Sequence, residues 1–511
     1  MNATTIIQKT PFMGRMFDID ESTGLSEVNR WPAMMIMASF IWLFTALFIG
    51  ALMPATQIFD IDTNVFYGAL TLHGAAMAFP FLFQLMVGMS LHRAGSCLGK
   101  PATGFLTQAI FFTMNGGAVL FAIAVIFGGL KISYAVMYPL PLVGVATGQW
   151  PMWSVVLGFT GIYFILASVI ILYPLKILQM TFLGKVREDL ILSKREITDP
   201  GMLGMVMSVL ILLVMGTPIV IIGTTILLGL YGIVPLAAIT WATEPIVFQF
   251  AFYIFAHNLM EAMAIMVISA VYGTLPLYLA DGSRKLYSDR LANLALWILL
   301  LTSFTSFFHH FFTMFPALPS ALAYHGNLMS WATGIGAALS IFTIIATVWQ
   351  HGVKPEPGVV ALFLGFVLYI FDGISAMITS NIAWSFQLHG TMWQSGHTMS
   401  VLIAMTLLWL GVLYHHYPVI TGRRLDRKLG NRFVALFTIG GLGAGWTMLA
   451  AGSDGMPRRY AAWNQEGWMV WGNLILLFGI ILGLGLAFLA YNFYTSRNID
   501  ATDEDKEAAG Y

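Results

Sequence analysis

The chain has 511 residues, of which 58% are hydrophobic and only 9% are charged. A soluble domain carries about 25% charged residues, so this composition excludes a large soluble globular protein and favours a membrane protein with many helices. The formal net charge is zero, which indicates no nucleic-acid partner, and the single cysteine, Cys97, excludes a disulfide framework and a cysteine-based metal site.

Twelve apolar stretches are long enough to cross a bilayer, which takes about 20 residues in a helix. They cover residues 31–54, 65–90, 104–130, 150–175, 205–230, 245–279, 290–314, 322–349, 358–379, 391–417, 433–452 and 468–494. The sequence therefore predicts an all-α integral membrane protein with twelve transmembrane helices. We expect one catalytic domain over residues 31–496, a short polar segment at 1–30 and a polar tail at 497–511, with membrane lipid around the spans.

The basic residues are unevenly divided between the two sides of these spans. With the N-terminus in the cytoplasm, all but three of the 24 Lys and Arg residues fall on the cytoplasmic side. The positive-inside rule therefore predicts that both termini are cytoplasmic. The exceptions are Lys131, Arg458 and Arg459, and the two adjacent arginines predict a local anionic partner on the outer side.

Five of the eleven histidines lie at positions in the predicted spans where a membrane protein rarely places an ionisable residue without a function. They are His73, His257, His309, His310 and His397. Four others lie near predicted cytoplasmic helix ends, where we expect contact with solvent: His92, His351, His415 and His416.

His257 and Glu261 are four residues apart in span six, so they share one helix face. The adjacent pair His309 and His310 ends span seven in "FFHHFFTMFP". Neighbouring side chains on a regular helix diverge by about 100°, so both can reach one metal only where the helix is irregular, and the nearby Pro316 favours that. Three imidazoles and a carboxylate suit iron or zinc. The alternative is a His–Glu hydrogen bond with two unrelated histidines.

Span ten carries "QSGHTMSVL", in which Met399 follows His397 by about 200° around the helix. Such a helix can serve two cofactors, one on each side. His73 in span two supplies another imidazole, and a haem accepts His with His or Met. The alternative for Met399 is packing, because the chain holds 30 methionines.

Five segments together resemble subunit I of the haem-copper oxidase superfamily, the catalytic subunit of respiratory oxidases and nitric oxide reductases. They are "TLHGAAMAFPF", "TEPIVFQFAFYIFAHNLMEA", "FFHHFFTMFP", "LHGTMWQSGHTM" and "GMPRRY". The resemblance covers nearly the whole chain. It implies that His73 binds a low-spin haem, with Met399 as the sixth ligand, and that His397 binds a high-spin haem, both expected to be haem b. It also implies that His257, His309 and His310 hold a second metal, and that Arg458 and Arg459 pair with haem propionates.

Four positions depart from the oxidase pattern. Met399 replaces a histidine, Glu261 replaces the tyrosine that supplies an electron and a proton to dioxygen, Leu259 replaces a proton-channel glutamate, and Gly336 lies near the position of a lysine. We therefore expect a protein that does not pump protons.

The spacing "HNLME" resembles the span-six pattern of nitric oxide reductases, whose second metal is a non-haem iron bound by three histidines and a glutamate. The resemblance implies the reaction 2 NO + 2 H⁺ + 2 e⁻ → N₂O + H₂O, as in denitrification. Those reductases carry a second glutamate where this chain has Ile265. The alternative is a divergent dioxygen reductase, a cytochrome c or quinol oxidase with copper at the second site. A third possibility is a non-catalytic gas sensor or haem scaffold.

The chain has no haem-c motif, so electrons are expected from a partner subunit with CuA or haem c on the outer face, or from quinol. His389 falls where the oxidases have a histidine near that interface, but Gly390 replaces the aspartate of their magnesium site. Asp372 and Glu244 are weak candidates for proton entry, and a helix-end role is the stronger expectation for Glu244. We expect the protein in a prokaryotic cytoplasmic membrane.

Overall fold

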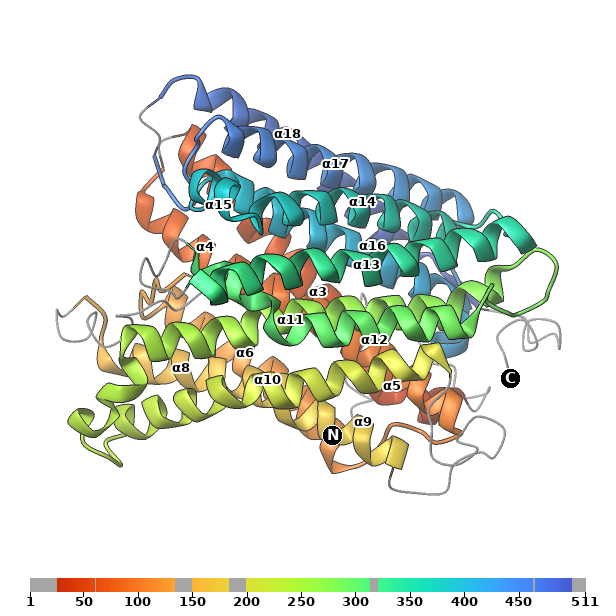
Figure 1. Cartoon of the computed structure of the whole chain (residues 1–511), viewed down its shortest axis with the longest axis horizontal. Helices are drawn as coiled ribbons and strands as arrows, with labels where there is room; N and C mark the ends of the chain where they lie inside the picture. Colours follow the sequence, from red (N-terminus) through yellow and green to blue (C-terminus); the bar gives the residue numbers. More distant parts are fainter. Residues whose placement is uncertain are drawn as a thin grey trace.

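The computed structural model describes residues 25–59, 61–133, 149–182, 199–312, 320–462 and 465–498. Within them, twelve helical segments are long and apolar enough to cross a membrane, so the predicted all-α, twelve-span fold is confirmed. Figure 1 shows these segments lying roughly along one direction, with α17 and α18 (blue) at one edge. The chain ends lie outside the described residues, and the cytoplasmic location of both termini stays a prediction.

Several spans consist of more than one helical segment. The α-helices are α3 (Leu25–Ile58), α4 (Thr63–Ala76), α5 (Gln84–Leu98), α6 (Phe105–Ile126), α8 (Met152–Ala167), α9 (Tyr173–Phe182), α10 (Pro200–Leu230), α11 (Pro245–Thr274), α12 (Asp289–Ser306), α13 (Ser320–His351), α14 (Pro357–Thr379), α15 (Ile382–Leu388), α16 (Met392–Thr421), α17 (Arg427–Ser453) and α18 (Trp468–Tyr494). The strands β1 (Arg423–Arg424) and β2 (Arg497–Asn498) form one short antiparallel pair.

Span two is interrupted by a π-helical segment, Met77–Phe83, between α4 and α5. Pro80 lies inside this segment, and proline cannot donate the backbone hydrogen bond that a regular α-helix needs there. The wider turn accommodates the proline without breaking the span. A second π-helical segment, Ser168–Leu172, joins α8 to α9, and a 3₁₀ segment, Phe307–Phe311, ends span seven.

Helix α11 begins with Glu244 as its N-cap and Pro245 in its first turn. One carboxylate oxygen of Glu244 accepts hydrogen bonds from the backbone amides of Ile246 and Val247 at 3.1 and 3.4 Å. A carboxylate at this end satisfies free N–H groups and complements the helix dipole. This is the helix-end role expected for Glu244.

Helices α14 and α16 pack closely because glycines line their contact. A Cβ atom added to Gly365 would lie 2.8 Å from Leu408 Cγ, and one added to Gly411 would lie 2.8 Å from the carbonyl oxygen of Gly358. Small residues allow membrane helices to approach in this way. The contact fixes the position of α14 relative to α16.

The expectation that His92 and His416 meet solvent is wrong, because their exposed fractions are only 2% and 9%. His92 Nδ1 lies 2.7 Å from Asn29 Oδ1, His92 Nε2 lies 3.2 Å from His416 Nδ1, and His416 Nε2 lies 3.4 Å from Thr274 Oγ1. The buried Arg93 donates to Thr274 Oγ1 at 2.7 Å. Since the helices pack side by side here, a position near a helix end does not imply solvent. We call His92, Arg93, Thr274 and His416 the histidine network.

Candidate haem and metal site

The structure brings all nine predicted site residues to the wall of one cavity of about 1100 Å³. They are His73, His257, Glu261, His309, His310, His397, Met399, Arg458 and Arg459. The cavity is larger than an ordinary small-molecule pocket, which measures about 300–1,000 Å³, and its size suits bulky cofactors.

His73, on α4, is held in one orientation. Its Nδ1 lies 2.8 Å from the carbonyl oxygen of Ala46 on α3, so this nitrogen carries the hydrogen and donates it. A Cβ atom at Gly50 would lie 2.6 Å from the ring, so the ring fits because residue 50 has no side chain. The other ring nitrogen is left available to a ligand, as is typical of a metal-binding histidine.

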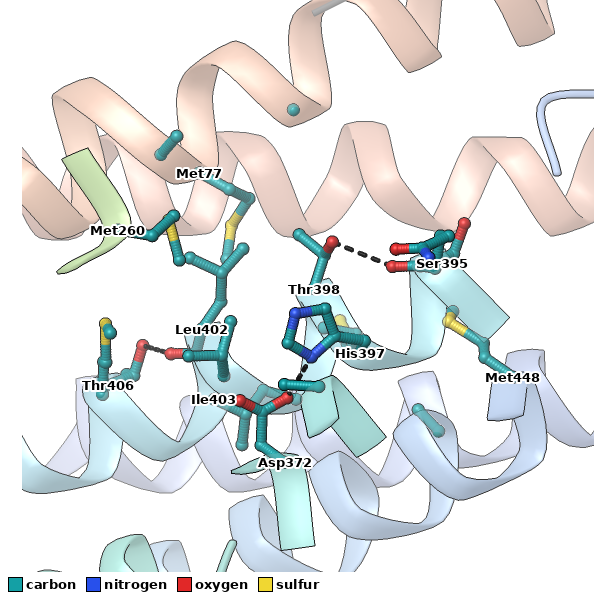
Figure 2. A pocket seen from close by; sticks show the side chains of 18 of the residues that line it. Met77, Met260, Asp372, Ser395, His397, Thr398, Leu402, Ile403, Thr406 and Met448 are labelled. Carbon is teal, nitrogen blue, oxygen red and sulfur yellow. Dashed lines mark hydrogen bonds and ion pairs between the residues drawn. The ribbon is translucent and has the colours of Figure 1, made fainter. Parts of the chain in front are cut away.

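His397, on α16, is held by a carboxylate. Its Nδ1 lies 2.8 Å from Asp372 Oδ1 on α14, as Figure 2 shows. The sequence marked Asp372 only as a candidate for proton entry and missed this pairing. The available signal was an acidic residue in the apolar run "YIFDGIS".

Met399 lines the same cavity as His397, although the two side chains leave α16 in nearly opposite directions. The cavity therefore extends around this helix, which is compatible with one cofactor on each side. Met77 and Met260 also line the cavity and appear near Leu402 in Figure 2. Met399 is thus one of several thioethers at the cavity wall.

His257, His309 and His310 form the only cluster of metal-ligating side chains found among the described residues. Each offers one nitrogen, and these nitrogens lie within 4.8 Å of one another. The 3₁₀ conformation of Phe307–Phe311 supplies the irregular helix end that the adjacent pair requires. Pro316, which we expected to cause it, lies outside the described residues.

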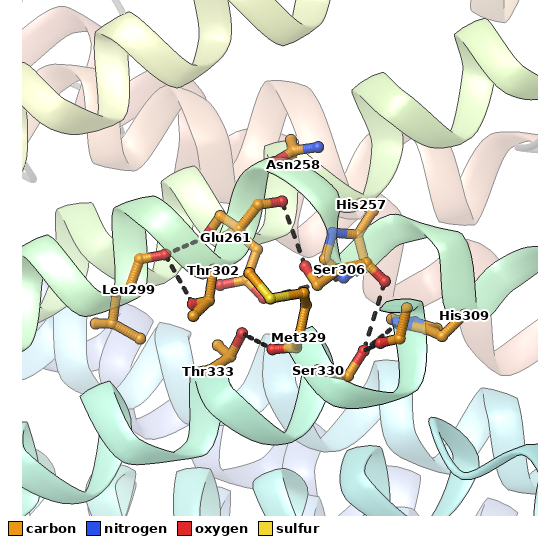
Figure 3. Close-up of polar contacts among 12 residues, drawn as sticks. His257, Asn258, Glu261, Leu299, Thr302, Ser306, His309, Met329, Ser330 and Thr333 are labelled. Carbon is orange, nitrogen blue, oxygen red and sulfur yellow. Dashed lines mark hydrogen bonds and ion pairs between the residues drawn. The ribbon is translucent and has the colours of Figure 1, made fainter. Parts of the chain in front are cut away.

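The three rings are held in different ways. His309 Nδ1 donates to Ser330 Oγ at 2.8 Å, as Figure 3 shows. The Ser330 hydroxyl donates to the Gly326 carbonyl. The ring of His310 stacks on Tyr253, with centroids 4.7 Å apart. His257 Nδ1 is buried without a hydrogen-bond partner. A buried unpaired nitrogen is costly, and a metal ion at this place would satisfy it.

Glu261 lies beside this cluster and not within it. Its Oε1 is 3.9 Å from His257 Nε2, its side chain is 17% exposed, and it lines the cavity (Figure 3). It does not belong to the group whose ligand atoms lie within 4.8 Å of one another. The structure thus places the carboxylate next to the predicted metal without bringing it into the three-histidine set.

At two positions where the resemblance implies proton-channel residues in the oxidases, this chain has Leu259 and Gly336. Leu259 lines the cavity and is 5% exposed. A Cβ atom at Gly336 would lie 2.7 Å from Leu299 Cγ and 3.0 Å from the Ala295 carbonyl oxygen, so a lysine has no space there.

Arg458 and Arg459 lie at the end of the cavity together with His389. The backbone amide of Arg458 donates to the carbonyl of Gly390 at 3.0 Å, which joins this loop to the start of α16. Burial and the two arginines lower the pKa of His389 to about 4, so this histidine is neutral at pH 7. This end of the cavity carries positive charge and suits carboxylates.

The donor set fits the cofactors that the resemblance implies. His73 and His397 each leave one ring nitrogen for a haem, and three imidazoles fit either iron or copper.

Comparisons with known proteins agree with this arrangement. Residues 31–482 match the family model described as "Cytochrome C and Quinol oxidase polypeptide I". The chain is 22% identical to cytochrome c oxidase subunit 1 of Thermostichus vulcanus over 420 residues, which are 80% of this chain and 71% of that protein. It is 23% identical to quinol oxidase subunit 1 of Bacillus subtilis over 478 residues, which are 91% of this chain and 71% of that protein.

A solved structure of a heme-copper terminal oxidase dimer superimposes with a TM-score of 0.74 at 18% identity, covering 93% of this chain and 84% of the matched chain. At this identity the likeness concerns the fold. The matched segment spans most of the chain and contains all nine predicted site residues. The chain therefore belongs to the cytochrome c and quinol oxidase polypeptide I family of the haem-copper oxidases, multi-pass membrane oxidoreductases of prokaryotic respiratory electron transport.

Proposed function

We propose that this protein is the catalytic subunit of a membrane nitric oxide reductase that reduces two NO to N₂O without pumping protons. The observation that carries the proposal is Glu261. A carboxylate lies 3.9 Å from His257, at the position where the resemblance implies a tyrosine in the oxidases. Four-electron reduction of dioxygen would lack its usual local donor there, whereas two-electron coupling of NO requires none.

In this proposal His257, His309 and His310 would hold a non-haem iron, and His397 would hold a high-spin haem. His73, with Met399, would hold a low-spin haem, which supplies electron transfer when bound. The non-haem iron and the high-spin haem iron would together supply electrons and Lewis acidity to two NO molecules held close together.

The chain's own residues position these groups and tune the site. Ala46 and Ser330 fix the rings of His73 and His309, so each ligand nitrogen is aimed before a metal arrives. Glu261 places a carboxyl group beside the metal cluster, and carboxylate oxygen favours iron over cuprous copper.

Electrons would enter at the end of the cavity that carries Arg458 and Arg459. Guanidinium groups suit haem propionates, and the place of both arginines beyond the end of α17 favours a donor subunit with CuA or haem c, or quinol, on the outer face. His389, neutral at pH 7, adds a polar group at this entry without adding charge.

Gas turnover tests the proposal. Purified enzyme, reduced by an artificial donor under anaerobic conditions, should convert NO to N₂O with one N₂O formed for every two NO consumed. Oxygen uptake measured on the same preparation should be much slower. Rapid oxygen reduction to water without N₂O formation would contradict the proposal.

A dioxygen reductase with copper is the second candidate, and two observations favour it. The matched relatives are named cytochrome c oxidase and quinol oxidase. Tyr253 and Tyr369 line the cavity, and Tyr253 stacks on His310, so a phenol is present near the metal cluster although not at position 261. The gas-turnover measurement separates the two candidates.

A further inference from the structure

We propose that Asp372 is a positioning residue that makes His397 a strong, partly anionic haem ligand and thereby lowers the reduction potential of the haem iron it holds. The proposal rests on His397 as a haem ligand and holds whichever gas is reduced.

The hydrogen bond between the two side chains is short and charge-assisted. His397 Nδ1 donates to Asp372 Oδ1 at 2.8 Å, as the dashed line in Figure 2 marks. Because Nδ1 carries this hydrogen, the other ring nitrogen presents its lone pair. Among the described residues His397 has no other partner than Asp372 and Ser375, so that lone pair is left for iron.

Asp372 is shielded from water, and its carboxylate pairs with one basic side chain. Its side chain is only 5% exposed, deep within α14. In the part of the chain that the structure describes, His397 is the one basic side chain with which Asp372 pairs. In such surroundings a hydrogen bond to a charged group is stronger than in water.

The surrounding residues hold this pair in place. Ser375 Oγ donates to the backbone carbonyl of Asp372 at 2.7 Å and lies 3.3 Å from His397 Nδ1. The glycine contacts at Gly365 and Gly411 fix α14 against α16, which carry the two residues. The packed helices therefore keep the carboxylate within hydrogen-bond distance of the imidazole.

The consequence for a bound haem follows from ligand chemistry. A carboxylate that accepts the N–H hydrogen raises the basicity of the imidazole. A more basic axial ligand donates more electron density to iron, which stabilises the ferric over the ferrous state and strengthens the iron–nitrogen bond.

The test is Asp372→Asn, which keeps the size and the acceptor oxygen but removes the charge. In the reduced enzyme, resonance Raman spectroscopy should show the iron–histidine stretch at lower frequency, and redox titration should show a higher midpoint potential for the high-spin haem. The matched control is Asp281→Asn, which alters another Asp–His pair, 2.6 Å from His351 at the protein surface, and should leave both values unchanged. Unchanged frequency and potential in Asp372→Asn with full haem content would overturn the proposal.

If Asp372→Asn does not fold or bind haem, the iron–histidine stretch of the unaltered protein still tests the proposal. The iron–histidine stretch should then lie above that of haem proteins whose proximal imidazole donates to a neutral backbone carbonyl. A frequency at or below that of such proteins would overturn the proposal, because a purely structural Asp372 would not strengthen the bond.

Discussion

Two groups of buried histidines differ in what their ring nitrogens contact. His73, His309 and His397 each have Nδ1 held by a protein oxygen, and the opposite nitrogen has no protein partner among the described residues. In the histidine network, His92 and His416 use both ring nitrogens in hydrogen bonds to protein. The first group lines a large cavity, and neither His92 nor His416 does.

The comparison teaches that burial alone does not identify a cofactor ligand. A buried histidine with both nitrogens satisfied is complete without a ligand, whereas one with a nitrogen facing a cavity is not. Along α11, Thr274 lies about 15 Å beyond Ala264 at the cavity wall. The buried side chains between them include Val267, Ile268 and Val271, so the network is separated from the cavity by apolar packing.

The largest expected effect comes from removing a cavity histidine. His257→Ala should abolish binding of the second metal and lower NO turnover by roughly 10³-fold, because Lewis acidity worth several kcal/mol is lost. The haem absorbance spectrum of this variant should match that of the unaltered protein, because His257 is not a predicted haem ligand. Full turnover in this variant would contradict the role of the three-histidine cluster.

Removing the carboxylate beside the cluster should have a smaller effect. Glu261→Gln is expected to lower the content of non-haem iron and to slow NO reduction by roughly 10–100-fold, as for residues that support a metal site. Glu244→Gln is the control, because it makes the same change at the exposed N-cap of the same helix. Equal activities of the two variants would remove the argument for iron that rests on Glu261.

A change in the histidine network should affect stability and not cofactors. His416→Leu leaves the buried His92 Nε2 without its partner and removes one of the two partners of Thr274 Oγ1, which costs about 1–3 kcal/mol. We expect a lower thermal unfolding temperature in detergent, with unchanged haem spectra and turnover. Loss of haem from this variant would show that the two groups are coupled.

The smallest expected effect concerns Asp281 and its partner His351. The backbone amide of Ser283, followed by His351, lowers the pKa of Asp281 from 3.8 to about 2. A lowered carboxyl pKa stabilises the fold above pH 3.8, and this contribution is lost as the pH falls through 2. Asp281→Asn should therefore unfold at a lower temperature than the unaltered protein at pH 5, and this difference should shrink as the pH falls towards 2. Equal unfolding temperatures at pH 5 would contradict the assignment.

Much of the fold could be predicted because membrane spans follow from composition. The stretch 468–494 matches α18 at both ends, and the stretch 358–379 misses the start of α14 by one residue. The π-helical segment Met77–Phe83 could not be predicted, because Pro80 is compatible with a kink, a break or a wider turn, and packing decides among them.

The candidate site could be predicted as a set of residues but not as a network of contacts. The histidines, Glu261 and the arginine pair stand out by residue type within apolar spans, and all of them reach one cavity. Their supporting partners come from other helices, namely the Ala46 carbonyl, Ser330 and Asp372. Spacing within one helix carries no information on these partners. For the same reason the sequence led to the wrong expectation that His92 and His416 contact solvent.

Metal analysis of the purified protein tests the central claim most directly. Iron and copper per chain would be measured together with the haem content, on protein from cells supplied with both metals. The account predicts iron in excess of the haem content by one atom per chain and negligible copper. Iron equal to the haem content, with one copper per chain, would contradict it and favour the dioxygen reductase.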